Sequence, residues 1–330
     1  MLNALACKNS KGPPIWLMRQ AGRYLPEYQR LRKERSLVEM FHCKETICQV
    51  TKLPLDILDL DAAIVFSDIL IVLDGLNIKW GFEEGVGPII ESNVERENLP
   101  TKIANFPYTP LVEAIKELKR TLHIPLLGFA GAPFTVASYL IEGRSSRDLL
   151  KTKQWLYQDP QSFHRLLEII TDAIIDLLHL QIKAGVDAIQ IFDSWAGHLS
   201  YDAFQTFCLR YHKKIIEALH STKIPIILFC KGSSSFAKEL ASLKPNCISL
   251  DWTLPIHSIR QITPSSIALQ GNLDPVILFA SKEVVKKEAE KILRSMRGDP
   301  GFIFNLGHGI LPKTPVDNVK VLIETIKSFY

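Results

Sequence analysis

Short apolar runs recur along the chain, and each one ends abruptly in polar residues or glycine. The clearest runs lie at 124–133, 187–195, 224–232, 246–252, 266–275 and 301–309, with further runs at 61–68 and 14–20. They are rich in Ile, Val, Leu and Phe and do not alternate with polar residues. This pattern is typical of parallel strands that are buried on both faces of a sheet.

Longer segments between these runs carry a helical period instead. Residues 161–184 place apolar side chains three or four positions apart on one helix face, and Gly185 follows as a stop signal. Residues 202–220 and 282–296 show the same period. Residues 79–88 combine aromatic residues with several glycines, which predicts a hairpin or a loop excursion.

Strands that alternate with helices predict right-handed parallel crossovers in an α/β fold. About eight such units indicate one closed (β/α)8 barrel of the TIM type, which we expect to occupy residues 1–330 as a single domain. An open, doubly wound sheet is the alternative. The dinucleotide-binding form of that alternative is disfavoured, because no GxGxxG motif follows a strand.

The composition, with 47% hydrophobic and 22% charged residues, is that of an ordinary globular protein. A net charge of +4 is too small a bias to predict nucleic-acid binding. No apolar stretch reaches the roughly 18 residues that span a bilayer, and the N-terminal residues do not resemble a secretory signal. The six cysteines form neither CxxC pairs nor a zinc-ligand spacing, so we expect reduced thiols in a cytoplasmic protein without a metal.

Residues with charged or hydrogen-bonding side chains stand at the predicted strand ends, where a barrel of this type places its active site. These residues are Arg19, Arg23, Asp68, Asp193, Ser194, Lys231, Asp251, Asn272, Asp274 and His308. The arginine pair is the most informative, because guanidinium groups bind carboxylates in a rigid, bidentate geometry. From the residues alone, plainer roles stay open: solvated arginines on a helix, a helix cap at Asp68, and a turn residue at His308.

Two long segments resemble the signatures of one enzyme family. The segments are PIWLMRQAGRYLPEYQ (14–29) and GFAGAPFTVASYLIEG (128–143), and both are similar to signatures of uroporphyrinogen decarboxylases. Shorter blocks, FSDIL (66–70), QIFDSWAG (190–197) and FNLGHGI (304–310), also resemble that family. The likeness covers about residues 11–320, in order and with fitting spacing.

The resemblance implies a single distorted (β/α)8 barrel that forms a homodimer and acts on a tetrapyrrole without a cofactor. It also implies which positions bind the substrate. Those positions are Arg19, Gln20, Ala21, Gly22, Arg23, Asp68, Tyr139, Ser194 and His308, and Arg32 stands where the family has another arginine. Asp68, Tyr139 and Arg19 are the implied catalytic residues, and Asp68 corresponds to an acidic residue at the floor of the cleft. Taken alone, Tyr139 could be a core aromatic.

The implied reaction suits these residue types. An acetate on a pyrrole loses CO2 only if the remaining electrons have an acceptor, and protonation of the ring carbon beside the acetate provides one. The resulting cation needs a fixed anion nearby, which Asp68 would supply. Apolar neighbours of Asp68 should raise its pKa by desolvation. The sequence does not identify the proton donor.

Two other functions are compatible with the same pattern. Corrinoid-linked zinc methyltransferases share the superfamily, but they use a His-x-Cys pair after a middle strand, and here Leu228 precedes Cys230 in place of the His. Those methyltransferases also use a later Cys, and here His308 stands near the position where the thiolate of that Cys would be expected. The second alternative is a tetrapyrrole carrier without activity, for which a desolvated carboxylate at position 68 would be an odd feature.

Overall fold

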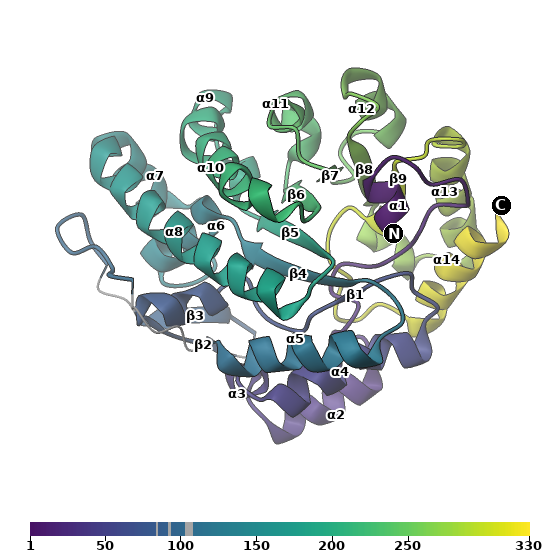
Figure 1. The fold of residues 1–330 in the computed structure, drawn as a ribbon, viewed down its shortest axis with the longest axis horizontal. Helices are drawn as coiled ribbons and strands as arrows, with labels where there is room; N and C mark the ends of the chain where they lie inside the picture. The colour runs from purple at the N-terminus through teal and green to yellow at the C-terminus, as the bar shows by residue number, and fades with distance from the viewer. Residues whose placement is uncertain (84, 92–93, 103–107) are drawn as a thin grey trace.

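A computed structural model describes residues 1–83, 85–91, 94–102 and 108–330 of the chain. Within these residues, seven parallel strands form one sheet in the order β1-β4-β5-β6-β7-β8-β9 (Figure 1). The strands are β1 Ala63–Ile64, β4 Leu126–Gly131, β5 Ala188–Asp193, β6 Ile226–Cys230, β7 Cys247–Ser249, β8 Ala268–Leu273 and β9 Phe302–Leu306. Every residue of β4, β6, β8 and β9 is buried, which explains their apolar runs without alternation.

Residues 14–18 close the ring between the two edges of this sheet. Ile15 pairs in parallel with Phe304 of β9, whose backbone N–H donates to the carbonyl of Pro14. The backbone N–H of Asp61, just before β1, donates to the carbonyl of Ile15. The segment therefore takes the eighth place in the ring, and the predicted TIM-type barrel is confirmed over the open sheet.

Helices surround the strands (Figure 1). They are α1 Leu2–Leu5, α2 Pro26–Glu34, α3 Leu37–Phe41, α4 Lys44–Ile57, α5 Thr109–Thr121, α6 Pro133–Glu142, α7 Leu150–Gln158, α8 Pro160–Ala184, α9 Tyr201–Phe204, α10 Arg210–Leu219, α11 Ala237–Ser242, α12 Ile256–Ile262, α13 Lys282–Ser295 and α14 Val316–Ser328. The predicted helix 202–220 is one helical stretch in which a π-helical turn, Gln205–Leu209, separates α9 from α10. Helices 161–184 and 282–296 are confirmed as α8 and α13.

The predicted hairpin is also present, as the antiparallel strands β2 Lys79–Glu83 and β3 Gly87–Glu91. Position 84, inside the predicted segment, lies outside the described residues. Among the helices of the described residues, none combines the length and apolar character needed to cross a membrane.

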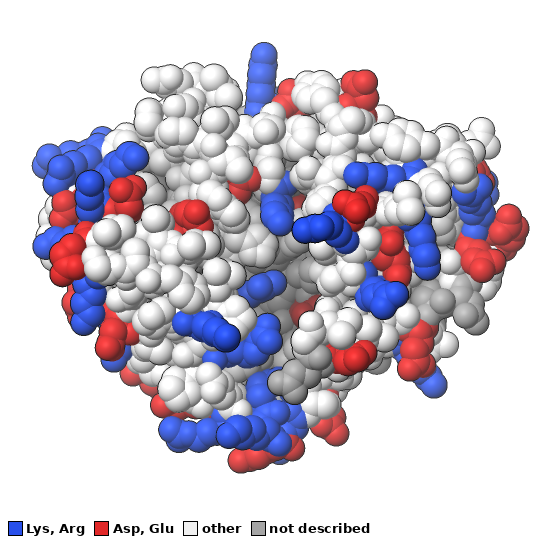
Figure 2. Space-filling model, turned by 180° about the vertical axis from the view of Figure 1, so that it is seen from behind, with Lys and Arg blue, Asp and Glu red and all other residues white. Residues whose placement is uncertain are grey.

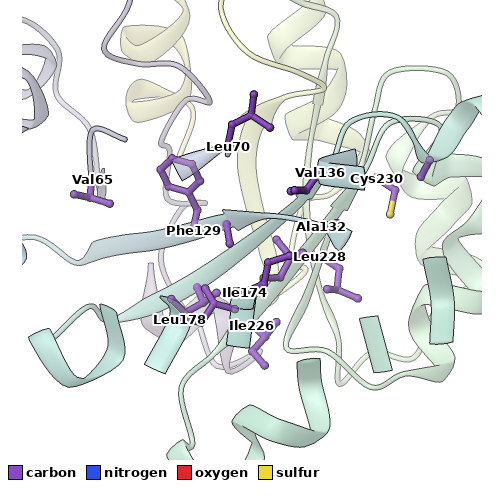
Figure 3. Packing of buried hydrophobic residues seen from close by; sticks show 14 of the residues in the cluster. Val65, Leu70, Phe129, Ala132, Val136, Ile174, Leu178, Ile226, Leu228 and Cys230 are labelled. Atoms are coloured by element: carbon purple, nitrogen blue, oxygen red, sulfur yellow. The ribbon is translucent and has the colours of Figure 1, made fainter. Parts of the chain in front are cut away.

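The pleat of the strands divides the core into an outer and an inner layer. Side chains that point outward pack against the helices, as Leu228 and Cys230 of β6 do with Ile174 and Leu178 of α8 in one buried cluster (Figure 3). Strand residues next to these in sequence, such as Ile227, point the other way and belong to a separate buried cluster inside the barrel. Because strand side chains alternate between faces, this division shows which residues beyond each strand end point into the barrel mouth.

Candidate active site

Polar side chains in the barrel interior fix the direction of the inward positions. Gln270 of β8 accepts a hydrogen bond from Nε1 of Trp16 over 2.8 Å, and its amide nitrogen donates to Gln190 over 3.1 Å and to Ser249 over 2.9 Å. These contacts link side chains of the closing segment, β5, β7 and β8 inside the barrel. Counting on by two from these positions, Ser194 after β5 and Asp251 after β7 point toward the mouth.

Arg19 follows the closing segment in a strained turn. Its backbone lies in the left-handed region, with a φ of 61°, which a non-glycine residue adopts only when its surroundings enforce it. On one side Met18 donates to the side chain of Asn305 and accepts from Ile310. The Arg19 side chain is exposed, and its stem lies directly against Gly309, where a Cβ would come within 2.5 Å of Cδ. The strained turn thus aims the guanidinium across the loop that follows β9.

Gln20 stabilises this turn through buried hydrogen bonds. The side chain is 1% exposed; its amide donates to the carbonyl of Ala62, and its backbone carbonyl accepts from the hydroxyl of Tyr24. Its backbone N–H is already bonded to Leu17. Gln20 therefore holds the loop of the predicted binding run, while Ala21 and Gly22 remain half-buried at its surface.

Arg23 is exposed, and its backbone carbonyl accepts a hydrogen bond from the Gln29 amide. Within the described part of the chain, neither Arg19 nor Arg23 has a carboxylate within ion-pair distance. Arg32 lies further along α2, where its guanidinium donates to the carbonyl of Arg35. The first two guanidinium groups are thus available to a ligand, whereas Arg32 has a structural contact.

Asp68 lies just beyond β1, half-buried, with its Oδ1 accepting from the backbone N–H of Leu70 over 2.9 Å. Burial raises the pKa of this carboxyl group from 3.8 to about 6, while the Leu70 N–H and the Arg19 charge oppose that shift. The expected desolvation of Asp68 is therefore present. The same side chain also stabilises the turn before the 3-10 helix Ile71–Leu76, but the N-cap residue of that helix is Leu70, so Asp68 is not its cap.

Tyr139 of α6 and Ser194 lie in the same region as Asp68. The ring of Tyr139 packs edge-on against Trp195, with centroids 5.5 Å apart. Burial chiefly raises the pKa of the Tyr139 phenol, the nearby Asp68 charge raises it further, and Arg19 lowers it. Ser194 is half-buried immediately before Trp195. The phenol is thus a neutral hydrogen-bond donor within the field of both Asp68 and Arg19.

His308 lies half-buried in the loop after β9, with its ring edge-on to Phe229 at 5.7 Å. The pKa of this imidazole is lowered to about 4, chiefly by burial and also by the charges of Arg19 and Lys231. At neutral pH it is therefore uncharged and offers one N–H donor. The charge of Arg19 shifts the pKa values of Asp68, Tyr139 and His308. The structure thus places these four side chains in one region of the barrel mouth.

Other strand-end candidates have structural partners. Asp251 accepts from the hydroxyls of Ser234 and Thr253, and Asn272 donates to two backbone carbonyls. Asp274 caps the 3-10 helix Pro275–Phe279 by accepting from the N–H of Val276. These three side chains hold the loops of the mouth in place.

A buried cluster behind Ser194 was missed by the sequence interpretation. The hydroxyl of Thr135 donates to Oδ1 of Asp193 over 2.6 Å, and Oδ2 lies 3.1 Å from Nε2 of His212, which is 1% exposed. Cys230 also lies within 4.8 Å of this pair. A signal was present, because His212 continues the apolar helix face of Cys208, Ile215 and Leu219.

Figure 2 shows Lys and Arg side chains gathered around a hollow near the middle of one face of the molecule. Together, the fold and the cluster define a TIM-type barrel protein whose mouth presents unpaired guanidinium groups beside a desolvated carboxyl group. The chain belongs to the uroporphyrinogen decarboxylase family (URO-D), which it matches over residues 1–329.

Curated relatives agree with this assignment, and a solved structure shares the fold. A uroporphyrinogen decarboxylase of Protochlamydia amoebophila is 48% identical over 99% of this chain and 91% of its own length. One of Ruthia magnifica is 40% identical over 99% of this chain and 98% of its own length. A methyltransferase from Methanosarcina mazei shares the fold, with a TM-score of 0.83 over 100% of this chain and 97% of that one, at 20% identity.

Proposed function

We propose that this chain removes the four acetate carboxyl groups of uroporphyrinogen III, giving coproporphyrinogen III and CO2 in porphyrin and heme biosynthesis. Family membership over nearly the whole chain supports the reaction class. The observation that carries the proposal is that the barrel mouth holds both a desolvated carboxyl group, Asp68, and the exposed guanidinium of Arg19, whose charge acts on it. A substrate rimmed by carboxylates and lined with pyrrole N–H groups is complementary to both.

In the proposed mechanism the pyrrole itself accepts the electrons. A proton adds to the ring carbon beside the acetate and leaves an iminium cation. The C–C bond to the carboxylate then breaks, CO2 departs, and the bond electrons neutralise the cation as an exocyclic methylene forms. A second proton converts that methylene into a methyl group, and the ring carbon then releases the first proton, which restores the neutral aromatic pyrrole. The reaction is a carboxy-lyase step in which the substrate itself accepts the electrons of the broken bond, as a cofactor does in other decarboxylases.

Asp68 would stabilise the cation by accepting hydrogen bonds from pyrrole N–H groups. With a pKa of about 6, it is mostly ionised at neutral pH even before the substrate binds. The N–H donors of the substrate would lower that pKa and hold the negative charge in place. A fixed charge in a desolvated position is worth about 3–4 kcal/mol of transition-state stabilisation.

The remaining residues would bind and orient the substrate. Arg19 and Arg23 have no carboxylate partner among the described residues and would take acetate or propionate carboxylates in bidentate contacts. The backbone at Ala21 and Gly22 would add N–H donors, and Gln20 would act by holding this loop. Tyr139, Ser194 and His308 would donate hydrogen bonds to carboxylates, and Tyr139 and Arg19 flank Asp68 during catalysis.

We further propose one barrel domain over residues 1–330, a homodimer, and a cytoplasmic location. The free thiols of all six cysteines suit a reducing compartment. Neither a membrane nor a nucleic acid is an expected partner, given the charge of only +4. Sedimentation of the purified protein tests the dimer, and a single species at the monomer mass would contradict it.

The methyltransferase alternative lacks the residues for a reactive zinc-bound thiolate. Leu228 and Cys230 both point outward into the buried layer between strands and helices, away from the barrel mouth (Figure 3). Burial raises the pKa of the Cys230 thiol well above its usual value. A thiol so placed cannot meet a substrate at the mouth, and His308 stands where a further thiolate would be expected.

The test is an anaerobic assay with uroporphyrinogen in which the wild-type protein is supplied with no metal or cofactor. We expect coproporphyrinogen and four equivalents of CO2, with identical rates before and after treatment with a chelator. Tight binding without CO2 release would favour a carrier instead. Stoichiometric zinc combined with a loss of activity on chelation would favour the methyltransferase chemistry.

A further inference from the structure

Lys231 stands at the barrel mouth and has no role in the site described above. It directly follows β6, and its side chain is exposed. Within the described ranges, no acceptor lies within ion-pair or hydrogen-bond distance of its ammonium group. An exposed lysine is usually a solvated surface residue. Whether Lys231 can bind a ligand therefore depends on the direction of its side chain and on how firmly its backbone is held.

The direction of Lys231 follows from the pleat of β6. Ile227 and Phe229 belong to the cluster inside the barrel, whereas Leu228 and Cys230 belong to the outer cluster. The next inward position after 227 and 229 is 231. The Lys231 side chain therefore leaves the strand over the barrel axis, on the side where a substrate enters.

The backbone at this position is held from several sides. The N–H of Lys231 donates to the carbonyl of Asp193, and the next N–H, of Gly232, donates to Asp251. Gly197 packs so closely that a Cβ there would come within 2.5 Å of the Lys231 carbonyl oxygen. The Lys231 Cα is thus fixed, so placing its ammonium group costs side-chain entropy only.

The position of β6 in the ring sets what Lys231 can reach. The closing segment 14–18 lies between β9 and β1, so β6 is four places from it in either direction around the ring. Arg19 and Lys231 accordingly stand on opposite sides of the mouth. The charges of both side chains act on the imidazole of His308, which follows β9.

We infer that Lys231 binds a carboxylate of the substrate on the side of the mouth opposite Arg19. A macrocycle with carboxylates around its whole rim needs cations on both sides, and Arg19 and Arg23 come from one short segment. Lys231 provides the second side, and its flexible stem suits successive substrates whose carboxylates disappear one at a time. This inference rests on the proposed function for the identity of the ligand.

The experiment compares Lys231→Gln and Lys231→Arg with Lys286→Gln as a matched control. Lys286 is exposed on α13 in the outer layer, so its replacement removes the same charge away from the mouth. We expect Lys231→Gln to raise KM for uroporphyrinogen about tenfold, equal to about 1.4 kcal/mol of binding free energy. We expect kcat to change much less and the salt dependence of KM to weaken. Lys231→Arg should restore most of the affinity.

A second measurement separates this inference from the proposed function. Fluorescence titration with uroporphyrin, the oxidised octacarboxylate, reports binding without turnover. If the wild type binds uroporphyrin but releases no CO2 from uroporphyrinogen, the proposed reaction is wrong. The role of Lys231 is then still measured by comparing the Kd of Lys231→Gln for uroporphyrin with that of the wild type. An unchanged KM and Kd in Lys231→Gln, or a fall in kcat alone, would overturn the inference.

Discussion

The hydroxyl of Thr135 donates to Oδ1 of Asp193 over 2.6 Å and accepts the backbone N–H of Trp195 over 3.1 Å. One side chain on α6 thus fixes both the last residue of β5 and the loop that presents Ser194. The side chains of Thr135 and Asp193 are both buried, so water cannot replace the hydrogen bond between them. The position of the mouth loop therefore depends on a residue outside the mouth.

Thr135→Val removes this hydroxyl while keeping the side-chain volume. The carboxyl group of Asp193 loses a donor and the N–H of Trp195 loses its acceptor. We expect the free energy of unfolding to fall by about 2 kcal/mol or more, measured by urea titration. Thr135→Ser keeps the hydroxyl and is the control. Equal midpoints for the two variants would show that the hydrogen bonds contribute nothing.

Asp68→Asn removes the negative charge from the cluster but keeps the shape of the side chain and an oxygen that can accept from Leu70. We expect kcat to fall about 100-fold or more, which corresponds to about 3–4 kcal/mol of lost transition-state stabilisation. Circular dichroism should be that of the wild type. Turnover close to normal would remove Asp68 from the mechanism.

The same substitution should change the pH dependence of stability. Burial raises the pKa of Asp68 from 3.8 to about 6, so the folded state holds this proton more tightly than the unfolded chain. The contribution of Asp68 to stability is therefore greatest below pH 3.8 and is lost as pH rises through about 6. Asp68→Asn removes this penalty.

Thermal unfolding across pH measures the effect. Asp68→Asn should be more stable than the wild type by about 1–3 kcal/mol above pH 6, a range lowered because the carboxyl group is only half-buried. The advantage should vanish near pH 4. A constant difference at all pH values would mean that desolvation of Asp68 is not its source.

Much of the fold was predictable because its signals are local in sequence. Each of the eight apolar runs became a strand or, at 14–20, the closing segment, since a strand buried on both faces needs an uninterrupted apolar run. The strand ends then indicated where Arg19, Asp68 and His308 would gather. Strand lengths were less predictable: the run at 61–68 contributes only Ala63–Ile64 to the sheet.

What escaped prediction depends on contacts between residues far apart in the chain. Thr135 and His212 meet at Asp193 only after three elements have packed, and the helical period indicated that His212 is buried but not which residues it contacts. The burial of Gln20 follows in the same way from its bond to Ala62. Within the binding run, sequence therefore indicated the segment, but only the fold separates the side chains that face a ligand from those that hold the loop.

Arg23→Ala should weaken substrate binding without affecting folding. The guanidinium of Arg23 has no carboxylate partner in the described part of the chain, so its removal costs the fold little. We expect KM to rise about tenfold and Tm to stay within about 2 °C of the wild type. Arg30→Ala is the matched control, because Arg30 is 74% exposed on α2 and lies 3.9 Å from Glu27 alone. An unchanged KM in Arg23→Ala would assign Arg23 to the scaffold.

Gly309→Ala tests whether the direction of Arg19 matters for activity. A Cβ at this position would come within 2.5 Å of Cδ and 2.7 Å of Cγ of Arg19. A flexible side chain can move away from such a contact, so we expect a small change in Tm but a displaced guanidinium and kcat/KM lowered about tenfold. Gly81→Ala, which would meet no atom within 4 Å, is the control.

A double-mutant cycle identifies the cause of that loss. If Gly309→Ala acts by displacing Arg19, it should have almost no further effect on kcat/KM once Arg19 is already alanine, because the two changes remove the same contact. Additive losses would mean instead that the methyl group disturbs His308 or the backbone of its loop. The cycle therefore separates a guanidinium that binds substrate from a loop that merely has to be the right shape.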